Sequence, residues 1–407
     1  MIEIGKIKVS SLIEQFGSPL YVYNEEVIIN RIRKLNEAII YPRKQILYAC
    51  KANTNLTIMK ILREENVWID AVSPGEVEIA FRAGFKSSEI LYTGDNTTDE
   101  EMQFCLKNKV KVNLGSLSQI ERYGKMNPNS DIFVRINPDC GAGHHGHTIT
   151  GGPESKFGIY FDKVNDIKSL ASKYNLKIVG IHSHIGSGIL DVNEFLKAID
   201  IVLNVAKNFN ELDFIDFGGG IGVPYRPTDK EIDLIDFGKR VSDKFQNFCK
   251  SYGKDLYLYL EPGRFLVAES GTLLASVVNI KETPTHKFVG TDSGFNHLIR
   301  PMAYGSYHQI LNCSNPSGKI EEVAITGNLC ESGDVFTQGE KGFENRPITQ
   351  VREGDILAIL CAGAYGFSMS SHYNSRPKPA EVLVNNGIAK LIRKRETIED
   401  LIRTMEV

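Results

Sequence analysis

Five short segments of this 407-residue chain carry residue types that could do chemistry together. They are YACKAN (48–53), HSHIGS (182–187), FGGG (217–220), EPGR (261–264) and CESGD (330–334). Lys51 closes an apolar stretch, and a lysine at a strand end can form a Schiff base with an aldehyde. The later segments supply a histidine, a glycine run and a carboxylate, which suit a phosphorylated pyridine aldehyde. We therefore predict a pyridoxal-phosphate enzyme with Lys51 as the attachment point.

Glu261 is the candidate partner of the cofactor's ring nitrogen. Decarboxylating or racemising an amino acid leaves a carbanion at Cα, and the pyridine ring accepts that charge best when its nitrogen is protonated. A carboxylate beside the nitrogen holds the proton there. The alternative is that Glu261, which precedes a proline, only caps a loop.

A phosphate needs several donors and close approach of the backbone. Gly218, Gly219 and Gly220 lack side chains, so their main-chain N–H groups can face a phosphate. Ser187 can add a hydroxyl and Tyr365 a phenol. The alternative for the glycine run is an ordinary tight turn.

The elements that must position these residues alternate between apolar strands and amphipathic helices from residue 46 to about 262. The strand candidates are 46–51, 67–72, 90–93, 110–114, 132–137, 178–184, 214–217 and 256–261. About eight such β/α units close a (β/α)8 TIM-type barrel. An open doubly wound sheet is the alternative.

The barrel interpretation brings the candidate residues together. In such barrels chemistry lies at the C-terminal strand ends, and phosphate often binds after strands seven and eight. Lys51, His184 and Glu261 end the predicted first, sixth and eighth strands, and the glycine run follows the seventh.

The histidines differ in their expected roles. His184 can stack on the cofactor ring, whereas His182 is expected on the other face of its strand, packed outside the barrel. Asp216 is expected to be structural rather than catalytic. The histidines of His144–His147 suggest metal, but their glycine-rich run lacks a matched acidic or cysteine partner. We expect no metal site, and a mobile loop covering the active site.

After about residue 275 the predicted strands lack long helices between them, which indicates a β-rich second domain. We expect a cofactor-binding barrel over 25–275 and the β-rich domain over 276–407, joined by residues 1–24. The net charge of −3 and pI near 6.3 suggest neither a nucleic-acid nor a membrane partner. Seven scattered cysteines without a Cys-x-x-Cys pair argue against disulfides and zinc, so a cytoplasmic location is expected.

Longer segments then carry a family resemblance. FGGGIGVPY, EPGRFLV, LIRPMAYGSYH, CESGDVF and GAYGFSMSSHYNSRP resemble the diaminopimelate decarboxylases, which are fold-type III pyridoxal-phosphate enzymes. The similarity runs from about Leu20 to the LIRKRETIEDLI tail. Decarboxylases of ornithine, arginine and carboxynorspermidine share the framework, so the substrate is the least specific part of the resemblance.

The resemblance implies a homodimer with active sites at its interface. Lys51 would carry the cofactor, and Cys330 from the neighbouring subunit would protonate the carbanion. The implied cofactor contacts are His184, Ser187, Gly218, Gly219, Gly220, Glu261, Gly263, Arg264 and Tyr365. The implied substrate contacts are Arg264, Arg300, Tyr304, Glu331 and Tyr365.

These residue types agree with meso-2,6-diaminopimelate, whose distal end presents both a carboxylate and an ammonium. An arginine fork binds a carboxylate bidentately, and Glu331 suits the ammonium. The alternative for Arg300 is an ion pair at a domain interface. We predict decarboxylation to L-lysine and carbon dioxide, the last step of lysine biosynthesis.

Other activities stay open from the sequence alone. A decarboxylase of D-lysine, D-ornithine or carboxynorspermidine could use the same scaffold, and an amino-acid racemase or a non-catalytic regulatory homologue are further rivals. A metal-dependent barrel hydrolase ranks last, because the strand ends are expected to lack a converging set of His and Asp ligands.

Overall fold

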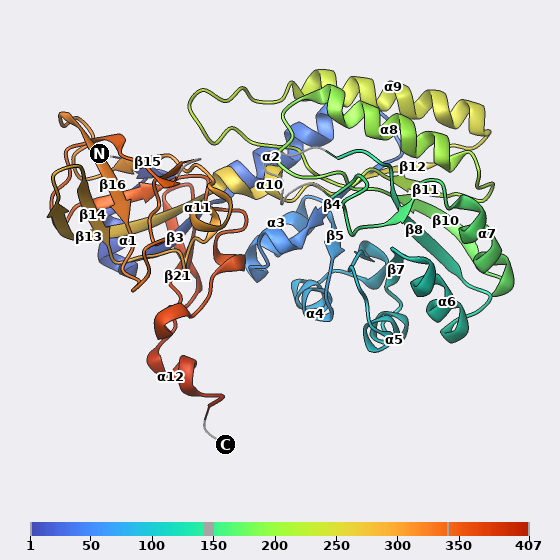
Figure 1. Cartoon of the computed structure of the whole chain (residues 1–407), viewed down its shortest axis with the longest axis horizontal. Helices are drawn as coiled ribbons and strands as arrows, with labels where there is room; N and C mark the ends of the chain where they lie inside the picture. The colour runs from blue at the N-terminus through green and yellow to red at the C-terminus, as the bar shows by residue number, and fades with distance from the viewer. Residues whose placement is uncertain (1, 142–149, 340–341, 406–407) are drawn as a thin grey trace. The chain divides into compact units, whose positions relative to one another are not determined.

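The computed structural model describes residues 2–141, 150–339 and 342–405, and the chain divides into two compact units (Figure 1). The barrel unit comprises Arg31–Val223 and Lys230–Leu266. The β-rich unit comprises Met1–Asn30, Pro224–Asp229 and Val267–Val407.

Eight parallel strands form a closed ring in the barrel unit. In chain order they are β4 (Lys44–Ala49), β5 (Trp68–Ala71), β6 (Ile90–Tyr92), β7 (Lys111–Leu114), β8 (Asp131–Asn137), β10 (Lys177–His182), β11 (Phe214–Asp216) and β12 (Tyr257–Leu260). Strand β12 pairs with β4, and β8 pairs with β10, so the sheet has no open edge there. The short β9 (Ile159–Tyr160) pairs outside the ring with β8. This closure confirms the (β/α)8 barrel and excludes the open sheet.

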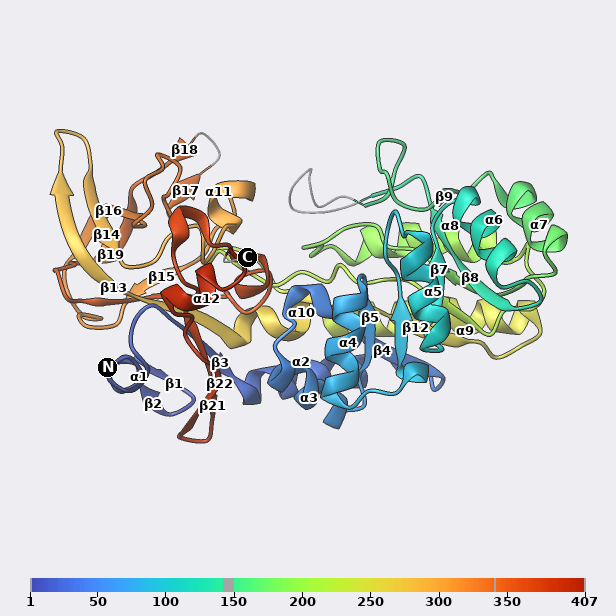
Figure 2. The same ribbon diagram turned by 90° about the horizontal axis from the view of Figure 1, so that it is seen from below.

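Helices lie outside the ring in both views of the barrel unit (Figures 1 and 2). They are α2 (Glu25–Ala38), α3 (Leu56–Glu64), α4 (Pro74–Ala83), α5 (Asp99–Lys107), α6 (Leu117–Met126), α7 (Val164–Lys173), α8 (Val192–Ala206) and α9 (Leu234–Tyr252), with α10 (Arg264–Val267) after β12. Side-chain caps begin several of them, including Ser73 before α4 and Thr98 before α5. The predicted apolar face of α8 is buried, as its spacing indicated.

The barrel interior is packed in layers. Every second strand of the ring, namely β4, β6, β8 and β11, contributes one residue to an apolar layer: Leu47, Leu91, Phe133 and Phe214. The aromatic rings of Phe133 and Phe214 lie 5.5 Å apart between centroids, in an edge-to-face arrangement. Four residues from alternate strands per layer is the arrangement that fills a barrel of this size, so a ligand can enter only at its ends.

The β-rich unit is held together by strands from both ends of the chain. Strand β3 (Leu20–Asn24) pairs antiparallel with β13 (Gly271–Glu282) and parallel with β21 (Ala380–Asn385). Leu20 and Val22 of β3 pack with Leu274 and Val382 in one core cluster. The ribbon of β13 and β14 (Lys287–Thr291) is the long hairpin of Figure 2. The N-terminal segment therefore supplies a central strand of this unit.

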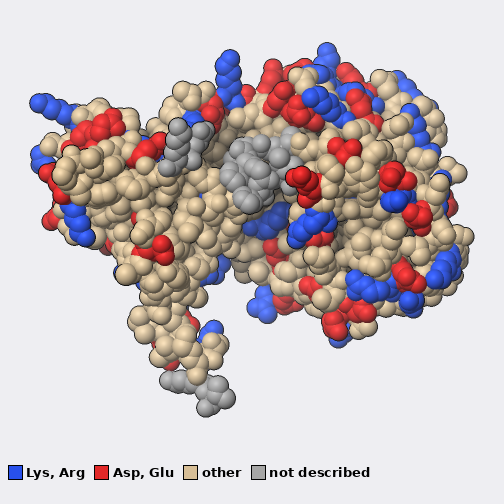
Figure 3. Space-filling model, in the orientation of Figure 1, with Lys and Arg blue, Asp and Glu red and all other residues tan. Residues whose placement is uncertain are grey.

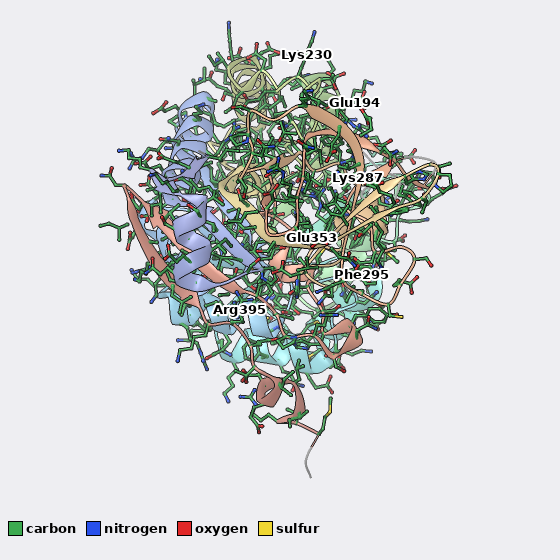
Figure 4. The ribbon with its side chains drawn as sticks, turned by 90° about the vertical axis from the view of Figure 1, so that its left-hand side faces the viewer. Glu194, Lys230, Lys287, Phe295, Glu353 and Arg395 are labelled. Carbon is green, nitrogen blue, oxygen red and sulfur yellow. The ribbon has the colours of Figure 1, made fainter. Side chains whose placement is uncertain are left out.

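The other elements of this unit are short. They are β1 (Glu3–Ile4), β2 (Ile7–Lys8), α1 (Val9–Phe16), β14 (Lys287–Thr291), α11 (Arg300–Tyr304), β15 (Ile310–Asn312), β16 (Ile320–Thr326), β17 (Gln338–Gly339), β18 (Gly342–Phe343), β19 (Arg346–Thr349), β20 (Ile356–Ile359), β22 (Ile388–Arg393) and α12 (Ile398–Ile402). Arg395, labelled in Figure 4, donates from Nη2 to the carbonyls of Phe16 (3.3 Å) and Pro19 (2.7 Å). This arginine ties the C-terminal segment to the loop before β3.

Acidic and basic side chains are interspersed over the face of each unit that Figure 3 shows. In the three described stretches of the chain, no helix is both long enough and apolar enough to cross a bilayer.

Candidate active site

Lys51 lies directly after the first strand of the barrel. Strand β4 ends at Ala49, and Cys50–Ala52 form a 3-10 turn, so Lys51 follows the strand rather than closing it as predicted. Its Nζ lies 3.6 Å from Asp70 Oδ2, and its side chain is 40% exposed whereas that of Asp70 is 1% exposed. The amine therefore stays accessible beside a buried carboxylate.

Asp70 is a site residue that sequence reasoning missed. It lies on β5, and its Oδ1 accepts a hydrogen bond from Thr93 Oγ1. Burial raises the pKa of Asp70 to about 7; repulsion from Glu261 also raises it, while Lys51 and Thr93 lower it. The only signal in the sequence is one acidic residue inside the apolar strand WIDA.

Strands β5, β7 and β10, together with the residue that follows β12, contribute a polar layer of four buried side chains: Asp70, Asn113, His182 and Glu261. His182 Nδ1 lies 2.8 Å from Asn113 Nδ2, and His182 Nε2 lies 3.0 Å from Glu261 Oε2. Burial would raise the pKa of Glu261, but the hydrogen bond and charge interactions with His182 and Lys51 outweigh it and lower the pKa. The contacts with His182 and Lys51 therefore favour the ionised form of Glu261.

The prediction that His182 packs outside the barrel was wrong. Its side chain is 1% exposed and makes both hydrogen bonds of the polar layer. Residues two apart in a strand share a face, so side-chain alternation gave no reason to separate His182 from His184. Strand β10 moreover ends at His182, so His184 lies beyond the strand in which it was counted.

Asp216 and the glycine run lie side by side at the end of β11. Asp216 Oδ1 accepts a hydrogen bond from the Gly218 N–H at 2.8 Å. Burial and the charge of Glu261 raise the pKa of Asp216 well above its usual range, which favours a protonated Asp216 beside an ionised Glu261.

The position of Asp216 bears on the expectation that the strand ends lack a converging set of His and Asp metal ligands. His182, Asp216 and Glu261 each offer a donor atom within 4.8 Å of the others, so His and Asp side chains do converge at the strand ends. The expectation that they would not converge failed because it placed His182 outside the barrel. His144–His147 fall outside the described residues.

The glycine run is packed too closely for side chains. A Cβ on Gly219 would lie 2.0 Å from the Glu261 carbonyl oxygen, and one on Gly220 would lie 2.5 Å from the Gly186 carbonyl oxygen. Gly218 has φ +68° and Gly220 has φ +107°, a region that favours glycine. The Gly219 N–H donates to His184 Nδ1 at 3.1 Å, and burial with the nearby Lys51 and Arg135 cations lowers the pKa of His184.

The segment 261–264, which follows β12, lies next to the glycine run and the end of β4. A Cβ on Gly263 would lie 3.0 Å from the Ala49 carbonyl oxygen, so this glycine lets the segment pass close to the end of β4. Arg264 is buried and donates to Ser187 Oγ from Nε at 3.2 Å and from Nη2 at 3.1 Å. The structure thus brings together the barrel residues that the sequence singled out: Lys51, His184, Ser187, Gly218, Gly219, Gly220, Glu261, Gly263 and Arg264.

The remaining candidates belong to the β-rich unit: Arg300, Tyr304, Cys330, Glu331 and Tyr365. Arg300 begins α11 and is 1% exposed. Cys330 and Glu331 are exposed in a loop. Tyr365 has a positive φ of 57°.

Arg300 is held by residues of its own unit. Its Nη1 lies 2.9 Å from His308 Nε2, its Nη2 donates to Ser306 Oγ at 3.2 Å, and its guanidinium lies 4.6 Å from the Tyr225 ring centroid. His308 Nδ1 lies 2.8 Å from the Leu360 carbonyl oxygen and must donate to it, so a neutral His308 accepts from Arg300. The arginine is therefore fixed in position by several contacts.

The barrel site fits a phosphorylated pyridine aldehyde. Lys51 supplies the amine. The N–H groups of Gly218 and Gly219 donate to Asp216 and His184, so the N–H of Gly220 is the candidate backbone donor to a phosphate. Glu261 is buried, and its carboxylate has acceptor lone pairs beyond those that His182 and Asp216 use, so it can accept from a protonated ring nitrogen.

Comparison with known proteins identifies the family of the barrel and of the whole chain. Residues 25–268 match the pyridoxal binding domain of the pyridoxal-dependent decarboxylases. Diaminopimelate decarboxylase of Methanothermobacter thermautotrophicus is 45% identical, covering 99% of this chain and 95% of the relative. A crystal structure of a diaminopimelate decarboxylase superposes with a TM-score of 0.91 at 36% identity, over 97% of this chain and 95% of that one. The Helicobacter pylori diaminopimelate decarboxylase complexed with L-lysine gives 0.89 at 33% identity, over 98% and 99%.

Fold, site and matched domain place this chain among the pyridoxal-phosphate-dependent decarboxylases. The identity continues beyond the barrel through the β-rich unit. The chain belongs to the diaminopimelate decarboxylase family.

Proposed function

We propose that this protein removes the carboxylate from the D-configured carbon of meso-2,6-diaminopimelate and releases L-lysine and carbon dioxide. The observation that carries the proposal is the 45% identity, over 99% of the chain, with a diaminopimelate decarboxylase. A relative complexed with L-lysine, which would be the product here, supports it.

Pyridoxal phosphate, when bound, supplies a ring that accepts the electron pair left at Cα as carbon dioxide departs. Lys51 would hold the cofactor through its amine. Gly218 and Gly219 let this loop pack closely, and the N–H of Gly220 together with the hydroxyls of Ser187 and Tyr365 would bind the phosphate. His184 packs on the ring, and Glu261 keeps a proton at the ring nitrogen.

Two arginines account for the proposed selectivity of the enzyme for this substrate. A carboxylate is bound best by a bidentate arginine fork, and the distal end of diaminopimelate presents one. Arg264 and Arg300 are both buried, and their guanidinium groups are fixed by hydrogen bonds to Ser187 and to Ser306. Glu331 binds the distal ammonium, with Tyr304 and Tyr365 completing the contacts.

Cys330 delivers the proton that replaces the lost carboxylate. Its thiol belongs to an exposed residue whose N–H donates to Asn374 Oδ1 at 2.8 Å, which fixes the backbone of the loop. We propose that the protein is a homodimer and that this thiol acts in the active site of the partner subunit. Exposure on the single chain is what such a role requires.

The test is carbon dioxide release by the cofactor-loaded protein from meso-diaminopimelate, D-lysine, D-ornithine and L-ornithine, each offered separately. We expect release from meso-diaminopimelate alone, with L-lysine formed in equal amount. Preferred release from a D-diamine would overturn the proposed substrate, and Arg300→Met should then leave that activity intact. With the proposed substrate, Arg300→Met should raise KM at least about tenfold, because it removes a charged hydrogen-bonding partner.

A further inference from the structure

Three side chains of the polar layer form a hydrogen-bonded row across the barrel. Asn113 lies on β7, His182 ends β10, and Glu261 follows β12, so the row connects three alternate strands of the ring. The two links measure 2.8 Å and 3.0 Å, and all three side chains are buried. The cofactor contacts proposed above use only the last of the three.

The chemistry of the end members fixes the protons along this row. An ionised carboxylate can only accept hydrogen bonds, so His182 must donate to Glu261 from Nε2. Burial lowers the pKa of His182, as do the Arg135 and Lys51 cations. A neutral imidazole that donates from Nε2 leaves a lone pair on Nδ1, which needs a donor, and the Asn113 amide nitrogen provides one.

We propose that His182 is a positioning residue for Glu261: Asn113 holds it as the Nε2–H tautomer, and its hydrogen bond orients Glu261 and keeps it ionised toward the cofactor's ring nitrogen. The inference rests on the proposed role of Glu261. Asn113 and His182 touch neither cofactor nor substrate in this scheme.

The neighbours of Glu261 explain why such support is needed. Asp216 lies beside it, and the side chains of Asp216 and Glu261 interact directly where both are buried. Two adjacent buried carboxylates cannot both stay ionised at low cost, so one of them takes a proton. The His182 N–H favours Glu261 as the ionised member, because the bond is made only to an acceptor.

A matched pair of variants separates this role from ordinary packing. His182→Gln keeps an N–H donor at about the same reach, whereas His182→Met has similar length and no donor. The readout is the 15N signal of ring-labelled pyridoxal phosphate in the resting holoenzyme, followed across pH without substrate. We expect His182→Gln to keep the ring nitrogen protonated over the wild-type range, and His182→Met to lose that protonation at lower pH. The rate of carbon dioxide release should fall about tenfold to a hundredfold in His182→Met only, the effect of losing a hydrogen bond to a charged group.

Equal pH profiles in the two variants, whatever their melting temperatures, would overturn the inference and leave His182 a structural residue. Glu261→Gln distinguishes a failure of the role proposed for Glu261 from a failure of the role proposed for His182. If that variant leaves the ring signal unchanged, the proposed role of Glu261 fails and the role of His182 fails with it. If Glu261→Gln shifts the signal and His182→Met does not, only the role of His182 fails.

Asn113→Leu provides a second route should His182→Met not fold. Leucine has nearly the shape of asparagine but no donor, so the His182 tautomer would no longer be fixed. In protein labelled with 15N-histidine, we expect the wild-type His182 signals to report an Nε2–H tautomer and the Asn113→Leu signals to report a mixture. An unprotonated Nε2 in the wild-type protein contradicts the proposal, because His182 could not then donate to Glu261.

Discussion

Asp216 and Glu261 hold the same glycine from two sides. Asp216 Oδ1 accepts from the Gly218 N–H at 2.8 Å, and the Gly218 carbonyl accepts from the Glu261 N–H at 2.7 Å. The loop proposed to bind phosphate and the carboxylate proposed to face the ring nitrogen are thereby linked through one residue. Removing the polar side chain of Asp216 should therefore affect both ends of the cofactor.

Asp216→Asn should be tolerated, because an amide has the shape of a protonated acid. Its oxygen can still accept from Gly218, and its NH2 can point toward Glu261 as the acid proton does. Asp216→Leu has a similar shape without either group, and we expect it to weaken cofactor binding about tenfold to a hundredfold. Cofactor titration of the two variants checks this prediction. Equal weakening in both would mean that Asp216 acts as an anion.

Gly219→Ala should disrupt the site through the backbone alone. Its Cβ would lie 2.0 Å from the Glu261 carbonyl oxygen, which cannot move without displacing the proposed ring-nitrogen partner. We expect a loss of about 1–3 kcal/mol in the free energy of unfolding, as for other overpacked positions, and weaker cofactor binding. Gly75→Ala on α4 is the control, since its Cβ would approach only Ser73 Oγ, at 3.7 Å. It should stabilise the helix by about 0.5–1 kcal/mol. Denaturant unfolding of both variants would show whether steric crowding at residue 219 is the cause.

Asp70 makes the stability of the cofactor-free protein depend on pH. Its folded-state pKa of about 7 is above the ordinary 3.8 because of burial. Between those values the folded protein binds more protons than the unfolded chain, so this group's contribution to stability is full below about pH 4 and is lost as pH rises through 7. Asp70→Asn should remove this dependence, with the exposed Asp166→Asn as a control for the change in charge. Unfolding free energies from about pH 4 to 8 test it, and parallel curves for wild type and Asp70→Asn would contradict it.

The barrel could be predicted from the sequence because each strand is recognised from its own short segment of the chain. Each strand candidate was an apolar run of the right length, and the strand ends lie at one face of any closed parallel barrel. For this reason Lys51, Glu261 and Gly218 could be grouped from their positions along the chain alone.

The polar layer beneath them could not be predicted in the same way. Asp70 is the one polar residue of β5, and Asn113 shares β7 with Lys111, and nothing local distinguishes an inward side chain from an outward one. His182 was misplaced because the predicted strand ran on to His184, whereas β10 ends at His182, and because residues two apart were assigned to opposite faces. Which residues share a layer depends on the register between strands far apart in the chain, and that register appears only when the ring closes.

Lys51 and Cys330 should complement each other across subunits if the proposed homodimer shares its active sites. Lys51→Ala should lose turnover and the visible absorbance of the bound cofactor, because it removes the attachment amine. Cys330→Ala should bind cofactor normally but protonate the carbanion slowly, so that product forms slowly. Since the two residues of one site would come from different subunits, a mixed dimer of the two variants contains one intact site and should regain activity that neither parent shows. Mixtures refolded together are compared with each variant alone, and Lys60→Ala, an exposed position on α3, serves as the control for losing a lysine. Mixed dimers that form but stay as inactive as their parents would show that Lys51 and Cys330 serve the same subunit's site.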